Sequence, residues 1–263
     1  MHLAHLPDEA FRQTGLVAMS RIAYQNTPLA IEKIRQGVFV FRSAGGTVTA
    51  VAGSDGCAVI DTGYGPREIK SGITRALSQA PNWLINTHWH FDHRDGNQAF
   101  VADGARIVAH TKCRIRLSHD QYVHSLEWSV PASPRIAWPT ITIDGASAID
   151  VGLETVQLLP QSASHTGGDL AVFLSSSNVL VMGDLFTNGG YPVIDESSGG
   201  SLRGMIDALE RLTPLVNADT VVVPGHGQVA DRHALILFRD MLPDDRKSDP
   251  LTDQSTTDAP GNL

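Results

Sequence analysis

The chain has 263 residues, of which 42% are hydrophobic and 18% are charged, a composition typical of a globular protein with a sizeable core. Its formal net charge of −8, with no long cluster of lysine and arginine, argues against nucleic acid or an anionic membrane as the main partner. No stretch approaches the ~20 apolar residues of a membrane-spanning helix, and two cysteines, Cys57 and Cys113, are too few for a disulfide framework.

The N-terminal residues lack the pattern of a signal peptide, because acidic and basic side chains interrupt every apolar run. We therefore expect a cytoplasmic protein, and the sequence gives no indication of its oligomeric state. Residues 1–36 have mixed polarity and are predicted to form an N-terminal extension. Short β-rich runs separated by glycine-containing turns follow, and they are typical of consecutive strands. These runs are residues 38–42, 47–52 and 57–61.

Pro66 stands at a suitable first-turn position for a helix, which we expect to reach residue 80. The alternation of strands and helices continues to residue 242, interrupted by a proline-rich segment, 128–146, that we interpret as a long loop. The further predicted strands are 83–87, 106–109, 154–159, 170–174, 179–182 and 220–223. The further predicted helices are 111–124, 202–216 and 229–242. Residues 243–263 are polar and proline-containing, and are predicted to be disordered.

The strands come in two batches, each followed by helices. This order suits two β-sheets packed against each other, with helices on the outside, in a single domain. The pattern therefore predicts an α+β domain over residues 37–242.

Four side chains that can bind a metal fall within six positions, directly after an apolar strand: His88, His90, Asp92 and His93. In extended backbone, residues two apart point the same way, so the first three can converge on one side. His93 requires a turn of the chain, for which Asp95 and Gly96 are suited. Imidazole and carboxylate together suit zinc, and also iron or manganese.

This His-x-His-x-Asp-His run resembles the signature of the metallo-β-lactamase superfamily. Four further motifs follow the order of that family: Asp61 before Thr62-Gly63, His165 in Ser-His-Thr-Gly-Gly-Asp, Asp184 in Gly-Asp-Leu and His226 in Pro-Gly-His-Gly. Taken singly, these residues have ordinary alternatives, such as a helix cap for Asp184. Each follows an apolar strand, however, and loops at strand ends are where ligands meet. The resemblance spans residues 37–240 and implies an αββα sandwich.

The resemblance also implies a ligand set for two zinc ions. One ion is held by His88, His90 and His165, and the other by Asp92, His93 and His226, while Asp184 bridges both; Asp61 has a structural role. Zinc lowers the pKa of a bound water to about 7, which provides a nucleophile at neutral pH. Asp92 is in addition the candidate proton shuttle to the leaving group.

The substrate class is narrowed by comparison of branches within the family. The best-known zinc β-lactamases have cysteine where this chain has Asp184 and lysine where it has Thr187. An aspartate resembles the glyoxalase II, lactonase and phosphodiesterase branches instead. Glyoxalase II-like enzymes carry a helical C-terminal extension, and the nuclease branches need further domains or a basic surface. We therefore expect a hydrolase of a small-molecule ester, lactone, thioester or lactam. Tyr191, in loop 187–200, is either an oxyanion donor or a packing residue.

Three alternatives remain open. The first is a persulfide dioxygenase with a single non-haem iron held by His88, His165 and Asp184. The second is a β-lactam-hydrolysing enzyme of an aspartate-bridged type, and the third is a metal-binding scaffold without turnover. Trp89 and Phe91 are expected to pack in the core, because alternate residues face away from the metals. The histidines expected not to be ligands are His2, His5, His110, His119, His124 and His233.

Overall fold

The structure is a computed structural model, and it describes residues 27–43, 45–123 and 128–243. The first sheet has seven strands in the order β1-β2-β3-β4-β5-β6-β9. Strands β1 to β4 are joined antiparallel, whereas β4, β5, β6 and β9 run parallel to one another. The strands are β1 (Ala30–Arg35), β2 (Val38–Arg42), β3 (Val48–Ala52), β4 (Cys57–Ile60), β5 (Pro81–Ile85), β6 (Arg106–His110) and β9 (Ile141–Ile143).

The second sheet has five strands in the order β10-β11-β12-β13-β14, antiparallel except for the parallel pair β13 and β14. Both sheets are therefore mixed, as the family resemblance implies. The strands are β10 (Ser147–Asp150), β11 (Thr155–Gln161), β12 (Asp169–Leu174), β13 (Val179–Val181) and β14 (Val221–Val223). A separate hairpin pairs β7 (Gln121–Val123) with β8 (Trp128–Val130).

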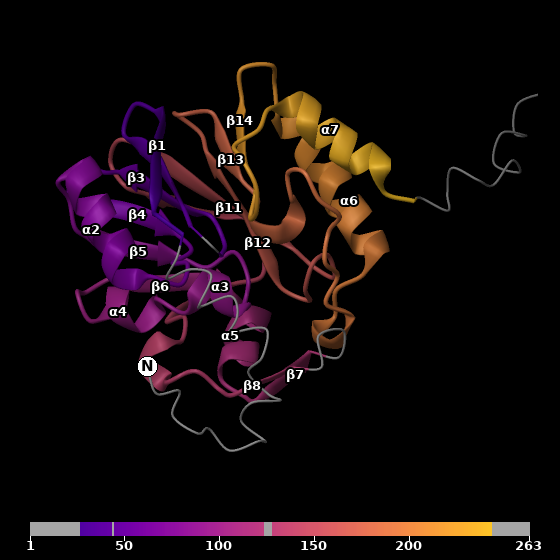
Figure 1. Ribbon diagram of the computed structural model, residues 1–263, viewed down its shortest axis with the longest axis horizontal. Coiled ribbons are helices and arrows are strands. Elements are labelled where there is room, and N and C mark those ends of the chain that lie inside the picture. The colour runs from indigo at the N-terminus through magenta and orange to yellow at the C-terminus, as the bar shows by residue number, and fades with distance from the viewer. Residues whose placement is uncertain (1–26, 44, 124–127, 244–263) are drawn as a thin grey trace, which may run out of the picture.

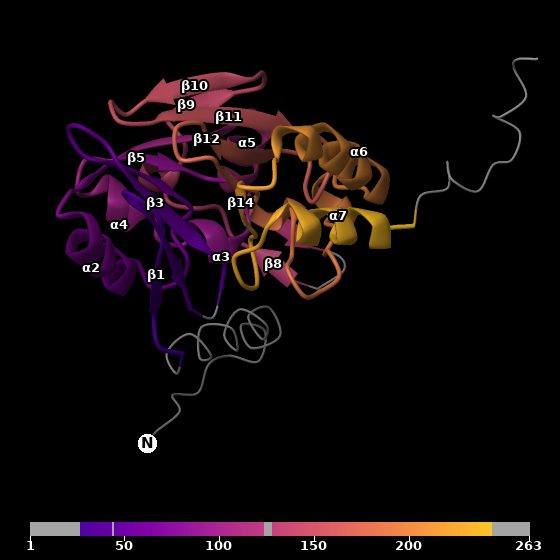
Figure 2. The same ribbon diagram turned by 90° about the horizontal axis from the view of Figure 1, so that it is seen from above.

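Helices lie on the outer sides of the two sheets (Figures 1 and 2). In the first half of the chain they are α2 (Pro66–Leu77), α3 (Phe91–Arg94), α4 (Asn97–Val101) and α5 (Thr111–Leu117); in the second half they are α6 (Leu202–Leu212) and α7 (Arg232–Met241). Helix α2 begins with Pro66, and α6 and α7 begin at capping residues, Ser201 and Asp231, that accept hydrogen bonds from the first turn. In the part of the chain that the structure describes, no helix is long and apolar enough to span a membrane.

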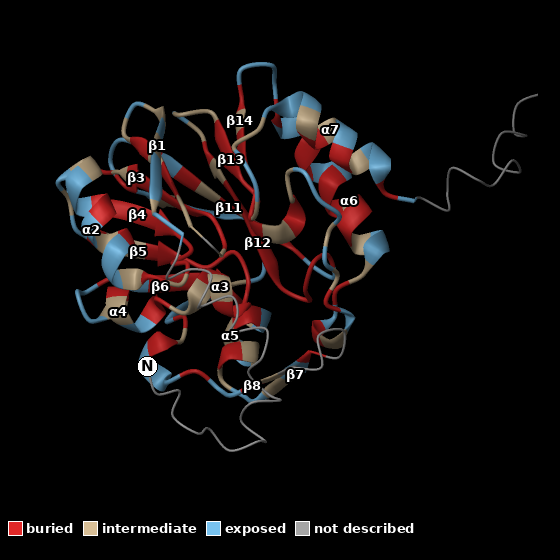
Figure 3. Cartoon of the chain, viewed as in Figure 1, coloured by how far each residue is buried: buried red, intermediate tan, exposed pale blue. Residues whose placement is uncertain are grey.

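Three apolar clusters separate the layers, and Figure 3 shows the buried strands between half-exposed helices. The central cluster joins the inner faces of the two sheets, with Val38 and Ile85 from the first packed against residues such as Leu158 and Val172 from the second. A second cluster lies beneath α2 and α4, and a third beneath α6 and α7. Because burial of apolar surface on both faces of each sheet is the main stabilising term, this layering fixes the αββα sandwich.

The structure corrects three expectations about the elements. Residues 30–35, placed in the extension, form edge strand β1 paired with β2, although none of their side chains is buried and they show little apolar pattern. The helix expected over 111–124 ends at Leu117, and the chain then turns into strand β7. The predicted loop 128–146 contains strands β8 and β9, each three residues long. The remainder of the predicted extension, 1–26, and the tail from 244 lie outside the described residues.

Candidate metal centre

The seven ligand candidates come from both halves of the sandwich. Four follow β5: His88 and His90 lie in the connection, and Asp92 and His93 lie in the short helix α3. The three others are contributed by loops of the second sheet, His165 before β12, Asp184 after β13 and His226 after β14. Backbone hydrogen bonds hold these loops together, including Leu170 N to Thr87 O (2.7 Å) and Gly225 N to Gly183 O (2.7 Å).

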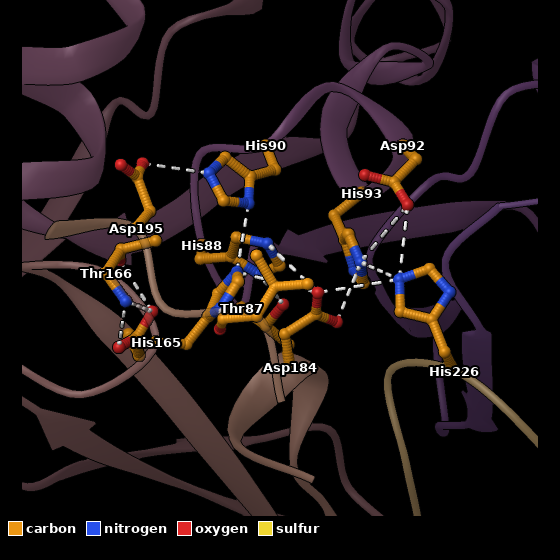
Figure 4. Close-up of polar contacts among 12 residues, drawn as sticks. Thr87, His88, His90, Asp92, His93, His165, Thr166, Asp184, Asp195 and His226 are labelled. Carbon is orange, nitrogen blue, oxygen red and sulfur yellow. Dashed lines mark hydrogen bonds and ion pairs between the residues drawn. The ribbon is translucent and has the colours of Figure 1, made fainter. Parts of the chain in front are cut away.

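The structure brings the predicted ligands into two adjacent groups (Figure 4). The ligand atoms within each group lie within 4.8 Å of one another, and the groups are His88, His90, His165 and Asp184, and Asp92, His93 and His226. In the first group, His90 Nδ1 lies 2.9 Å from His165 Nε2. In the second, His226 Nε2 lies 3.3 Å from Asp92 Oδ2.

Asp184 lies between the two groups. Its Oδ2 is 3.5 Å from Nε2 of His165 in the first group and 3.5 Å from Nε2 of His226 in the second, and its Oδ1 is 3.1 Å from His93 Nε2. No larger residue fits at Gly225, where an added Cβ would come within 2.0 Å of Asp184 Oδ1. Glycine at this position therefore leaves room for the Asp184 carboxylate between the two groups.

Three of the histidines are oriented by an acceptor that contacts Nδ1, on the outer side of the ring. Nδ1 of His93 lies 2.8 Å from Asp61 Oδ2, and Nδ1 of His165 lies 2.6 Å from the Val193 carbonyl oxygen. Nδ1 of His88 lies 3.1 Å from the hydroxyl oxygen of Thr87, which itself donates to Asp61 (2.7 Å). When the outer nitrogen carries the proton, the inner nitrogen presents its lone pair to the centre.

His90 is oriented in the opposite sense, by a residue that the sequence analysis did not identify. Its Nε2 lies 3.1 Å from Asp195 Oδ2, so Nδ1 faces the other ligands. Asp195 is buried, and its second oxygen accepts from the Ser197 hydroxyl (2.5 Å) and the Ser198 amide (3.2 Å). No local sequence pattern marks this aspartate, because its partner lies 105 residues away in the chain.

The charges of the site favour a bound cation. Burial lowers the pKa of His88 well below its usual value and that of His165 to about 4, so both rings are neutral at pH 7. Burial acts in the same direction on His93, but Asp184, Asp92 and Asp61 outweigh it and hold the pKa of that ring well above its usual value. Asp184 is also the main cause that raises the pKa of His226 to about 10. A cation at this position would meet the same carboxylates.

An orphaned nitrogen gives an independent test of whether a metal fits. Within the described part of the chain, the Nε2 atom of His88 is buried and has no hydrogen-bond partner. A buried polar atom left unpaired costs roughly 1–3 kcal/mol, and this one faces Asp184 Oδ2 at 3.9 Å. Imidazole nitrogens and carboxylate oxygens are the donors preferred by zinc and by related transition metals. The residues present therefore fit a metal ion.

Most of the sequence interpretation of this region agrees with the geometry, with one difference. The chain turns at Phe91, earlier than expected, so Asp92 joins His93 rather than converging with the first two histidines. Trp89 and Phe91 are buried in an apolar cluster, as expected. His110 caps helix α5 and accepts from the Lys112 amide (3.0 Å), and it belongs to neither group.

The other described residues named in the sequence analysis belong to neither of the two ligand groups. Asp61 is buried, has a left-handed φ of 62°, and accepts from the Thr87 amide and hydroxyl, in agreement with a structural role. Tyr191 is 67% exposed in the loop after Asp184, and its role as an oxyanion donor stays a prediction. His119 and His233 lie outside both groups, while His2, His5 and His124 are not among the described residues.

Comparison with known proteins identifies the family. Residues 44–226 match the model of the metallo-β-lactamase superfamily. The chain belongs to this superfamily, and the predicted family and fold are confirmed. A metallo-β-lactamase from Pontibacter korlensis has the same fold, with a TM-score of 0.68 at 22% identity, over 82% of this chain and 99% of that one.

Curated relatives are also distant in sequence. A hydroxyacylglutathione hydrolase of Rhodospirillum rubrum is 28% identical over 171 residues, which cover 65% of this chain and 57% of the relative. A probable metallo-hydrolase of Methanocaldococcus jannaschii is 28% identical over 156 residues, 57% of this chain and 72% of that protein. The chain thus spans little more than half the length of the Rhodospirillum enzyme. Both names agree with the predicted class, a metal-dependent hydrolase.

The contact between Asp195 and His90 leads to a first prediction. Asp195→Asn removes a charged acceptor behind one ligand of the first group, so metal affinity of that group should fall about 10–100-fold. The second group should keep its affinity. Both affinities are measured by titration of the metal-free protein with Co²⁺, in which the absorption spectrum of the bound Co²⁺ is recorded. Asp231→Asn is the matched control, because it changes an aspartate that caps α7 into another good cap. An equal loss at both groups would contradict the assignment.

Proposed function

We propose that the protein is a hydrolase that binds two zinc ions and cleaves an ester, thioester, lactone or lactam bond in a small molecule. The observation that carries this proposal is the set of four histidines, each with one ring nitrogen held by an acceptor and the other turned towards Asp184 or a neighbouring ligand. Such outer partners are typical of metal-ligating imidazoles. The relatives support the hydrolytic class through their names.

Zinc bound here would act as a Lewis acid and lower the pKa of a coordinated water to about 7. The residues of the chain have three tasks around it. His88, His90 and His165 would hold one ion, and Asp92, His93 and His226 would hold the other, with Asp184 shared. Asp61 fixes the His93 ring through a 2.8 Å contact. Asp92 has a second task, because a carboxylate at the edge of the site can move a proton to the leaving group.

Two residue positions and the names of relatives support an acyl compound as the substrate. Asp184 and Thr187 occupy the positions where the best-known zinc β-lactamases have cysteine and lysine, so a dedicated β-lactamase of that subclass is disfavoured. Two relatives are named for hydroxyacylglutathione, an acyl compound. From these two positions and these names, we infer that the substrate of this protein is also an acyl compound. A cytoplasmic location and the absence of a nucleic-acid partner remain predictions from the sequence.

The test is a substrate screen on purified, zinc-loaded protein. Acyl thioesters, acyl-homoserine lactones, the lactam nitrocefin and bis-p-nitrophenyl phosphate represent the possible bonds. We expect turnover of at least one acyl compound, loss of turnover with a chelator and recovery with zinc. Turnover of the phosphodiester alone would contradict the acyl assignment, and oxygen consumption with a persulfide would favour the dioxygenase alternative.

A second prediction concerns metal stoichiometry. The protein should bind close to two zinc ions per chain, and His226→Ala should reduce this towards one, because it removes a ligand of the second group only. His226 is a suitable site since its side chain is 37% exposed, whereas His93 is fully buried against Asp61. Elemental analysis and a thermal melt measure metal and fold. His233→Ala, a histidine outside both groups, is the control. Unchanged stoichiometry, or one iron per native chain, would count against a two-zinc site.

A further inference from the structure

A cavity of about 420 Å³ lies between the loop that follows Asp184 and helix α7. The described residues that line it are Phe186, Thr187, Asn188, Gly189, Gly190 and Tyr191 from the loop, and Ala234, Leu237, Phe238 and Met241 from the helix. Its volume is within the range of small-molecule sites, which is roughly 300–1,000 Å³.

The lining is suited to an apolar ligand. None of the described lining residues carries a charge at neutral pH. Phe186 and Phe238 are buried and stack edge to face, with ring centroids 5.0 Å apart. In contrast, Tyr191, Leu237 and Met241 are 67%, 57% and 39% exposed. Large apolar side chains that stay exposed together around a cavity mark a binding surface.

Neither the Asn188 amide group nor Gly189 fills this cavity. The Asn188 amide group is already engaged, because its Nδ2 donates to the Gln228 carbonyl oxygen (2.8 Å). Gly189 has a left-handed φ of 89°, and a Cβ at that position would have nothing within 4 Å. At Gly189 the wall of the cavity is therefore backbone, with no side chain to fill the space beside it.

The cavity begins beside the metal ligands. Thr187 forms a parallel β-bridge with His226, and the Asn188 amide donates to the His226 carbonyl oxygen (2.9 Å). Phe186 accepts a hydrogen bond from the Gly225 amide (3.0 Å). Thr187 follows Asp184 by three residues, which span at most about 11 Å of extended chain. The wall of the cavity formed by Thr187 is thus within a short distance of the metal centre.

We propose that this cavity binds the apolar acyl chain of the substrate, so that the enzyme prefers acyl compounds with chains of several methylene groups. This inference rests on the proposed acyl hydrolysis and adds a preference for acyl chains of a certain length. An acyl chain that extends from the metals along the Thr187 loop combines an apolar body, which suits this lining, with a bond that the metal centre can cleave. Chain binding by Leu237 and its neighbours then contributes to KM.

The experiment compares saturated acyl thioesters of two to ten carbons on the zinc-loaded, full-length protein. Each buried methylene should lower KM about fourfold until the cavity is full, with little change in kcat. Leu237→Glu places a charge at the rim and should abolish this dependence on chain length, while the two-carbon substrate and the zinc content stay unchanged. Leu153→Glu is the matched control, because Leu153 is an exposed leucine (68%) that does not line the cavity.

A binding measurement separates this proposal from the proposed function. A ten-carbon thioether, which has no carbonyl carbon to attack, should bind to wild type and to Leu153→Glu, and at least tenfold more weakly to Leu237→Glu, in isothermal titration. If the two-carbon thioester is hydrolysed but chain length has no effect, the acyl-chain site is wrong and the proposed function stands. If no acyl compound is hydrolysed, the proposed function fails. A concentration-dependent dimer that Leu237→Glu dissociates would show that a second copy covers the cavity, and would also overturn the proposal.

Discussion

Asp184→Asn is expected to release both metal ions from the protein. The Asp184 carboxylate lies within 3.5 Å of nitrogens from each group and is the ligand candidate shared between them. Substitution by asparagine removes the negative charge between the two proposed cation positions. It also replaces one carboxylate oxygen by an amide nitrogen, whose lone pair is not available to a metal. The affinity of both groups should fall by more than the ~10–100-fold that follows loss of an outer partner. Elemental analysis after dialysis at limiting zinc measures this effect.

The control for this variant is Asp207→Asn, an aspartate on helix α6 that pairs with Arg203 at the surface. It should retain two ions per chain. Retention of one tightly bound ion by Asp184→Asn would show that the carboxylate belongs to a single group.

Asp92→Asn is expected to keep most of the metal and to lose turnover. The side chain contacts His226 at 3.3 Å and lies at the edge of the second group, away from the first. If it delivers a proton to the leaving group, its loss should lower kcat by ~10²–10⁴-fold. The loss should be largest for poor leaving groups, such as amides, and small for activated aryl esters, which depart without a proton.

The measurement must separate ligation from proton transfer. Turnover is therefore compared at saturating zinc, where a weaker ligand no longer limits occupancy, on an amide and on a p-nitrophenyl ester. His226→Ala is a matched control, because it weakens the same group without removing a carboxylate. A uniform loss on both substrates would reduce Asp92 to a ligand.

The order of sheets and helices was accessible from the sequence because most strands are apolar runs bounded by glycine. Strand β1 is not predicted for a physical reason: at the edge of the sheet none of its side chains is buried, so no apolar pattern distinguishes it. Its pairing with β2 depends on backbone hydrogen bonds, which any sequence can form. The helix from Thr111 ended early for a similar reason. Strand β7 is held by a partner strand, β8, that local propensity does not reveal.

The metal centre was predictable to a different degree at each level. The ligands are reactive residue types in dense motifs, and the grouping implied by family resemblance agrees with the geometry. Asp195 was not predictable, because a single aspartate in a loop has many ordinary roles and only the folded chain places it behind His90. The cavity beside α7 was also beyond the sequence, since it depends on how the Thr187 loop lies on the helix.

The ligand candidates come from loops of both sheets, and this affects how the stability of the protein depends on metal supply. His93 and His226 are 133 residues apart in the chain, and they meet only when the two halves of the sandwich have assembled. An ion held by both is a reversible cross-link that the unfolded chain cannot form without closing a large loop. Free zinc at 100 times the dissociation constant would therefore stabilise the native state by about 2.7 kcal/mol. Loss of the proposed zinc ions should therefore lower resistance to proteolysis together with the proposed activity.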